Sequence, residues 1–217
     1  MIGAMIIAVD GSAASGKGTL SKRLADHFNL AYLDTGSLFR ALALQLLNAG
    51  TVIDDIDENP PIEESTSLDV GSCNPPEIRT DRVASLASKV AILPEVRTNL
   101  LTLQRNFAND PPHGNGAVLD GRDIGSVVVP ETPIKFFIDA KLEVRAERRF
   151  KELLHAGQSV MFRNVLADMR ERDQRDRTRS VAPLRAADGA KIIDTSTMDA
   201  EKVFAVALDH VKHIVGT

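Results

Sequence analysis

The chain has 217 residues, a length that suits one domain with small additions. Its 43% hydrophobic and 26% charged residues can bury a core and exclude a disordered chain, while a net charge of -4 excludes a basic nucleic-acid coat. The single cysteine excludes an internal disulfide and any zinc site with several thiolates, so we expect a cytoplasmic protein.

Five short apolar runs that end in aspartate predict the strands of a sheet. Because they are continuously hydrophobic, they are typical of strands covered on both faces, as in parallel sheets with helical connections. The pattern predicts an α/β fold with a doubly wound, parallel, five-stranded sheet and helices on both faces. The runs are Ile6–Asp10, Ala31–Asp34, Ala117–Asp120, Ile134–Asp139 and Lys191–Asp194. The first run has no basic lead-in or cleavage site, and no run is long enough to span a membrane.

Segments with helical spacing lie between these runs, and the first has Leu20, Leu24 and Phe28 on one face. The segment 51–76 differs, because its seven acidic residues and four prolines predict an irregular insertion outside the sheet. Further helices are predicted at Arg79–Ala91, Glu95–Asn109, Leu142–His155, Val160–Arg177 and Ala200–Val215.

Residues 11–19 match the phosphate-binding pattern Gly-x-x-x-x-Gly-Lys, between a predicted strand and a predicted helix. Glycines let backbone N–H groups point at a polyphosphate, the helix start adds its positive end, and Lys17 reaches the terminal phosphates. The alternative is a glycine-rich turn with a solvated lysine. The predicted ATP-binding residues are Gly11, Ser12, Ala13, Ala14, Ser15, Gly16, Lys17, Gly18 and Thr19.

Gly18 follows Lys17 where the general pattern has a Ser or Thr that holds magnesium, and Thr19 stands one position later. We therefore expect Mg²⁺ to be held mostly through water and phosphate, near Thr19 and Asp120. The chain lacks the guanine-reading Asn-Lys-x-Asp, which disfavours a GTPase.

Seven arginines and four acidic residues lie between positions 163 and 185. For most of them we favour a solvated helix with ion pairs between residues i and i+4. However, the apolar stripe that begins at Phe162 continues onto Arg172, Asp176 and Arg179. An unpaired charge on this inward face would be costly. We therefore expect the two arginines to bind an anion there.

Two further motifs follow predicted strands, where doubly wound sheets bind ligands. The segments 34–40 and 120–123 offer Arg40 and Arg122 to a phosphate. Together with the phosphate loop, they predict a cleft for a second anionic ligand.

The sequence resembles the bacterial cytidylate kinases of the nucleoside monophosphate kinase family over nearly its whole length. The matching motifs are Gly-Lys-Gly-Thr at 16–19, Thr-Gly-x-x-x-Arg at 35–40, Asp-Gly-Arg-Asp at 120–123 and the arginine-rich segment 172–184. The resemblance implies a monomeric P-loop kinase that transfers the γ-phosphoryl group of ATP to CMP, and also to dCMP, with Mg²⁺. It implies a core (about 1–40, 96–154 and 186–217), a monophosphate-binding insert (about 41–95) and a short lid (about 155–185).

The resemblance also implies roles for individual residues. Ser88, Arg97 and Asp123 match positions that read cytosine. The implied catalytic residues are Lys17, Arg40, Arg122 and Arg172. The implied CMP-binding residues are Thr35, Arg40, Ser88, Arg97, Arg122, Asp123, Arg172, Asp176 and Arg179.

The chain departs from the relatives in two places. The phosphate loop reads Ser-Ala-Ala-Ser at 12–15 where relatives usually have Pro-Ser-Gly-Ala, and we expect ATP binding to persist provided that Ala14 avoids a positive φ. The insert is shorter than in the longer bacterial enzymes and lacks alternating strand patterns.

Two alternatives stay open. One is a kinase of another small acceptor, such as UMP, AMP or a sugar acid, and the other is a non-catalytic ATP-binding regulatory module. In the favoured case the partners are small nucleotides, with no nucleic acid and no membrane.

Overall fold

The computed structural model describes residues 4–51, 56, 59–73 and 76–216. The chain forms two compact units, one made of Met1–Leu33 with Pro111–Thr217 and the other of Asp34–Asp110. The predicted insert falls inside the second unit. That unit also contains the helix at 94–109, which the prediction assigned to the core.

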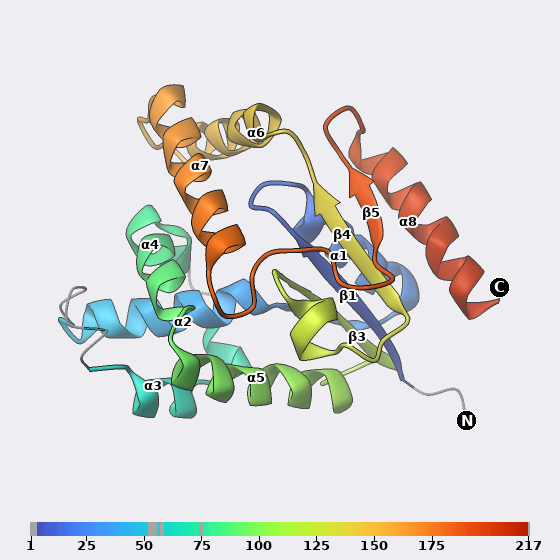
Figure 1. Cartoon of the computed structure of the whole chain (residues 1–217), viewed down its shortest axis with the longest axis horizontal. Helices are drawn as coiled ribbons and strands as arrows, with labels where there is room; N and C mark the ends of the chain where they lie inside the picture. The colour runs from blue at the N-terminus through green and yellow to red at the C-terminus, as the bar shows by residue number, and fades with distance from the viewer. Residues whose placement is uncertain (1–3, 52–55, 57–58, 74–75, 217) are drawn as a thin grey trace. The chain divides into compact units, whose positions relative to one another are not determined.

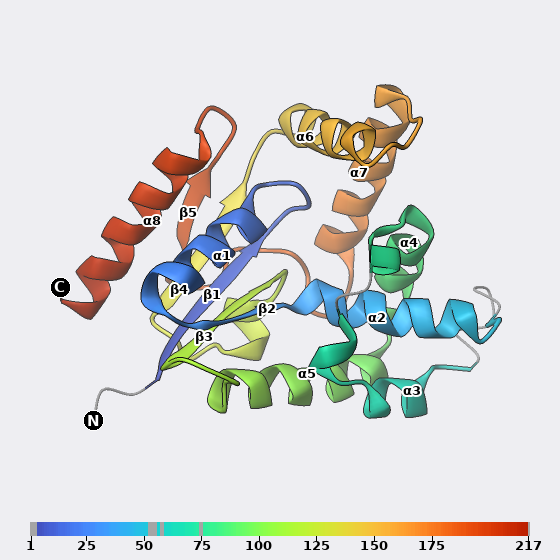
Figure 2. The same ribbon diagram turned by 180° about the vertical axis from the view of Figure 1, so that it is seen from behind.

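The first unit is built on a five-stranded sheet in the order β2-β3-β1-β4-β5 (Figures 1 and 2). Each pair whose register is described, β1 with β3, β1 with β4 and β4 with β5, is parallel. All six residues of β3 are buried, so both faces of that strand are covered, and the predicted α/β sheet is confirmed. The strands are β1 (Met5–Gly11), β2 (Ala31–Asp34), β3 (Gly116–Gly121), β4 (Ile134–Asp139) and β5 (Lys191–Asp194).

Helices α1 (Lys17–Phe28) and α8 (Ala200–Val215) lie on the same face of the sheet (Figure 2). Their apolar sides pack on β1 and β4 because the predicted helical spacing places leucine and valine on one face. Asp199 caps α8 by accepting a hydrogen bond from the N–H of Lys202 (2.8 Å). This packing fixes the start of α1 directly after the central strand.

Helices α6 (Leu142–His155) and α7 (Phe162–Thr178) form a helical hairpin with its own small core. Ala13 and Ala14 of the phosphate loop pack against that core. The predicted stripe on α7 is wrong at its first position: Phe162 is 39% exposed, and Val165 occupies the buried face instead. The stripe then continues, as predicted, through Met169 to Asp176.

The second unit is helical, and its buried residues include Leu38, Leu42, Leu86 and Leu100. Its elements are α2 (Thr35–Asn48), α3 (Ile62–Ser67), α4 (Asp81–Val90), α5 (Pro94–Asn109) and the 3₁₀ helices Val70–Cys73 and Pro76–Arg79. The described residues of the acidic segment 51–76 form short helices and no strand, and the rest of that segment lies outside the described residues. Within the described part of the chain, no helix has the length and apolar character needed to cross a membrane.

Candidate active site

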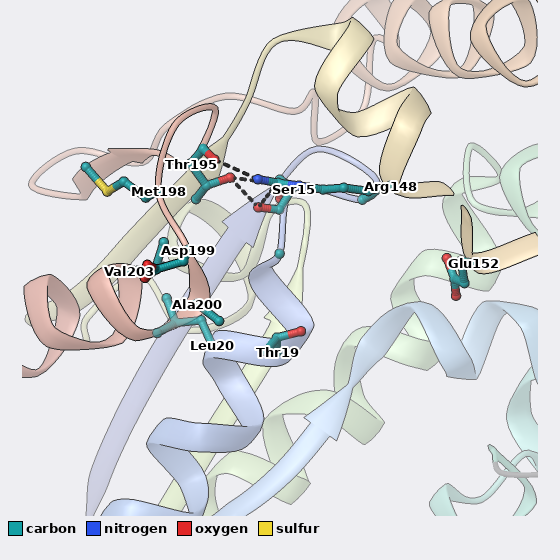
Figure 3. A pocket seen from close by; sticks show the side chains of 12 residues that line it. Ser15, Thr19, Leu20, Arg148, Glu152, Thr195, Met198, Asp199, Ala200 and Val203 are labelled. Carbon is teal, nitrogen blue, oxygen red and sulfur yellow. Dashed lines mark hydrogen bonds between the residues drawn. The ribbon is translucent and has the colours of Figure 1, made fainter. Parts of the chain in front are cut away.

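The phosphate loop connects the central strand β1 to α1, as predicted. Gly16 precedes the helix with φ 93°, a left-handed conformation that glycine adopts without strain. A cavity of about 470 Å³ opens beside the loop and is lined by Ser15, Gly16 and Thr19 (Figure 3). The loop therefore has both a backbone able to bind phosphate and adjoining space for the rest of a nucleotide.

The condition that Ala14 avoids a positive φ is not met, because its φ is 56°. This left-handed region is open to L-residues, but for alanine it costs about 1–2 kcal/mol. The loop thus keeps the backbone shape that a glycine would adopt, at some expense in stability.

Replacing Ala14 by glycine is expected to stabilise the protein by about 1 kcal/mol, which corresponds to a rise in Tm of about 2–4 °C. Thermal unfolding followed by circular dichroism measures this shift. Ala13→Gly is the matched control, because Ala13 is not among the residues with positive φ, and it should destabilise. An unchanged or lower Tm for Ala14→Gly would show that the lost methyl packing outweighs the relief of strain.

Lys17 and Asp120 meet at the carboxyl ends of β1 and β3. The Nζ of Lys17 donates a hydrogen bond to Asp120, and the hydroxyl of Tyr32 lies 3.3 Å from the other carboxylate oxygen. A Cβ on Gly18 would lie 3.2 Å from that oxygen, tighter than ordinary contact. A serine at position 18 would therefore require the Asp120 carboxylate to shift by a few tenths of an ångström.

The residues around Asp120 fit a magnesium ion that is bound mainly through a substrate. Among the described residues, no three His, Cys, Asp or Glu side chains gather as a metal site. Mg²⁺ keeps several waters and needs only one or two carboxylates when substrate phosphates supply other ligands. Asp120 is such a carboxylate, and the contribution of Thr19 stays a prediction.

Three arginines surround the carboxylate of Asp176, and we call Arg122, Arg172 and Arg179 the arginine cluster. The Nε of Arg122 donates to Asp176 over 3.0 Å. Burial alone would raise the pKa of Asp176, but the charges of all three arginines outweigh it and hold the pKa below its ordinary value. The prediction that charges on α7 face inward is confirmed at Asp176, which is 7% exposed.

Asp123 adjoins the arginine cluster. Its Oδ1 lies 3.9 Å from Arg179, whose Nε donates to the carbonyl oxygen of Ala182 (2.6 Å). The structure therefore brings together, within one unit, Asp123 and four of the predicted acceptor-binding residues: Arg122, Arg172, Asp176 and Arg179.

Asp10 was not among the predicted site residues. Its carboxylate accepts hydrogen bonds from the N–H groups of Ile124 (2.7 Å) and Gly125 (2.8 Å). Burial raises the pKa of Asp10 to about 7, against the lowering effect of these two hydrogen bonds, and the charges of Asp123 and Asp120 raise it further. The sequence identified Asp10 only as the last residue of a predicted strand and gave no sign of its hydrogen-bond partners.

Arg145 was also missed. It is 3% exposed, pairs with Asp173 of α7 through two hydrogen bonds, and donates to the carbonyl oxygens of Ala13 (3.3 Å) and Ala140 (2.8 Å). The interpretation of Asp173 as part of a solvated intrahelical pair is therefore wrong. Since Arg145 follows Leu142 by three residues, a charge on the inner face of α6 was a detectable signal.

Arg148 and Thr195 connect the cavity to the phosphate loop (Figure 3). Arg148 donates to the hydroxyl and carbonyl oxygens of Thr195 (2.9 and 2.7 Å), and the Thr195 hydroxyl donates to the carbonyl oxygen of Ser15 (2.8 Å). Apolar side chains, including Leu20 and Met198, line the same cavity. Apart from Ser15, none of these residues belongs to a motif that the sequence displays.

The remaining predicted acceptor-binding residues belong to the second unit: Thr35, Arg40, Ser88 and Arg97. Arg40 donates to the carbonyl oxygen of Ile78 (3.2 Å), and Arg97 donates to that of Ala91 (3.1 Å). Thr35 is buried at the start of α2, and Ser88 is half-buried on α4. That these four residues bind the acceptor together with the arginine cluster stays a prediction.

Comparisons with known proteins point to one family. A family model described as cytidylate kinase matches residues 7–213. The chain is 50% identical to a cytidylate kinase of Paramagnetospirillum magneticum, over 94% of this chain and 95% of the relative. It is 49% identical to one of Rhodospirillum rubrum, over 96% and 98%. A solved structure of an uncharacterized protein from Eubacterium ventriosum matches with a TM-score of 0.55 and 14% identity, over 96% and 98%, and supports the fold alone.

Proposed function

Because the chain belongs to the cytidylate kinase family, we propose that it transfers the γ-phosphoryl group of ATP to CMP, giving ADP and CDP, and that dCMP is a second acceptor. The observation that carries the proposal is the arginine cluster, formed in the same unit as the phosphate loop. A monomeric state and a cytoplasmic location are part of the proposal as predictions from the sequence.

The chemistry requires two polyanions to meet in line. The acceptor is a phosphate oxygen of CMP that already carries charge, so the reaction needs no general base. The barrier lies in bringing the phosphates together and stabilising charge on the transferring group. The positive charges of Arg122 and Arg172 can stabilise the negative charge on that group. Before the acceptor binds, the carboxylate of Asp176 balances part of the positive charge of the arginine cluster.

We assign the donor to the phosphate loop and its cavity. The loop N–H groups and Lys17 would bind the phosphates of ATP, and the apolar cavity wall near Leu20 and Met198 would receive the base. Asp120 and Thr19 would hold Mg²⁺ together with the substrate phosphates, where the ion neutralises phosphate charge. The contact between Lys17 and Asp120 keeps the lysine side chain at the loop.

We assign the base of the acceptor to Asp123, with Ser88 and Arg97 as further contacts. A carboxylate can accept a hydrogen bond from the amino group of cytosine. Uracil has an oxygen at that position, so it would face the carboxylate with an acceptor and lose affinity. Arg40 and Thr35 would meet the acceptor phosphate, as the family motif implies.

The proposal is tested by giving the protein ATP and magnesium with each of the common nucleoside monophosphates, with a sugar acid such as gluconate, or with no acceptor, and by measuring ADP release. CMP-dependent turnover is the expected result. Preferred turnover of UMP, AMP or the acid would instead identify a kinase of another acceptor. ATP binding without any acceptor-dependent turnover would identify a regulatory module.

Asp123→Asn is expected to shift the preference from CMP toward UMP by about 10²-fold in the ratio of kcat/KM values, because the amide can donate to the uracil oxygen. Steady-state kinetics with both acceptors measures the ratio. Asp209→Asn, on the exposed side of α8, is the control and should leave the ratio unchanged. An unaltered ratio in Asp123→Asn would remove Asp123 from base recognition.

A further inference from the structure

Asp10 caps a short helix from a distant part of the chain. Its side chain is 2% exposed, and its two N–H donors, Ile124 and Gly125, begin the π-helix Ile124–Val128. The first N–H groups of a helix have no partner inside it. Asp10 supplies the missing acceptors, in a helix type that recurs at functional sites.

The segment before this helix is fastened at both ends. Gly121 pairs with Asp10 in the parallel register of β1 and β3, and Ile124 and Gly125 are held by the Asp10 side chain. The carbonyl oxygen of Asp123 accepts hydrogen bonds from the π-helix, with Val127 N at 2.9 Å. Arg122 and Asp123 therefore lie on a span that is held at one end by strand pairing with β1 and at the other end by the Asp10 side chain.

We propose that Asp10 is a positioning residue for base selection, which fixes the Asp123 carboxylate relative to the pair formed by Arg122 and Asp176. The inference rests on the proposed function, since it takes Asp123 as the group that meets the cytosine amino group. A carboxylate suits this task because each of its oxygens accepts one N–H. An asparagine has one acceptor and one donor, so one backbone N–H would face an NH₂ group.

Asp10→Asn is therefore expected to lower the ratio of kcat/KM for CMP to that for UMP about tenfold, mainly through a higher KM for CMP. Both acceptors are measured on the same preparation, so any unfolded fraction cancels from the ratio. Asp194→Asn is the matched control: Asp194 also ends a strand and accepts from a backbone N–H, that of Ser196 (2.8 Å). Its ratio should not change.

Hydrogen exchange of the peptide 121–129 gives a second readout, with faster exchange expected in Asp10→Asn than in the Asp194→Asn control. If the ratio is unchanged in Asp10→Asn but shifted in Asp123→Asn, the positioning role is overturned and base reading by Asp123 stands. If neither variant shifts the ratio, the base-reading assignment fails and the positioning role fails with it. Exchange equal to the wild type would also overturn the proposal, because the segment would not depend on Asp10.

Discussion

Lys17→Met is expected to lower kcat by about 10³-fold or more, in line with the loss of a cation that stabilises a transferring phosphoryl group. Lys17 is the cation of the phosphate loop, and methionine keeps the aliphatic length without the charge. The variant also leaves the carboxylate of Asp120, which is 1% exposed, with Tyr32 but without its lysine. KM for ATP should rise as well, because the lysine would contact the ground-state phosphates.

Coupled ADP-release kinetics at saturating CMP measures the effect. Lys22→Met is the matched control, since Lys22 is an exposed lysine on the same helix and should retain near-native kcat. A fall of less than tenfold in Lys17→Met would mean that the loop does not act on the γ-phosphate, and the assignment of ATP to this loop would have to be abandoned.

Asp176→Asn is expected to destabilise the free protein by about 3–5 kcal/mol, the usual cost of removing one partner from a buried ion pair. The change leaves three guanidinium groups around a neutral amide in a site that is largely shielded from water. An anion can take over the role of the missing carboxylate. We therefore expect CMP or sulfate to raise the Tm of the variant more than that of the wild type.

The direction of the pKa shift of Asp176 predicts how the stabilities of the wild type and the variant depend on pH. The pKa of Asp176 is lower in the folded protein than its ordinary value of 3.8. Its contribution to stability is therefore present above that value and is lost as the pH falls through the folded pKa. Urea titrations from pH 7 to well below pH 3.8 should show a smaller acid-induced loss of stability in the variant than in the wild type.

Asp168→Asn, which changes an exposed acid on the same helix, serves as the control for both measurements. A variant as stable as the wild type, with an equal gain from sulfate, would contradict the view that Asp176 balances the arginine cluster.

The sequence predicts the sheet well because the periodicity of a buried strand is local. All five strands appear within two residues of their predicted ends, and Gly16 and Lys17 stand at the junction of strand and helix as their motif requires. The inward charges of α7 were also predictable, because Asp176 continues a buried stripe with helical spacing.

The long-range contacts of the site were not predictable from one sequence. Asp10 binds N–H groups more than a hundred positions away, and nothing in the neighbourhood of either segment indicates the pairing. The spacing of α6 can place Arg145 on its inner face, but nothing in the sequence names Asp173 of α7 as its partner. The φ of Ala14 could not be fixed from the sequence, because the shape of the whole loop overrides the preference of one residue.

The close approach of Gly18 to Asp120 links two positions that are far apart in the chain. A side chain at 18 would require the carboxylate at 120 to move by a few tenths of an ångström, and this is the carboxylate that Lys17 contacts. The residue at 18 therefore helps to set where the neighbouring lysine meets its acidic partner.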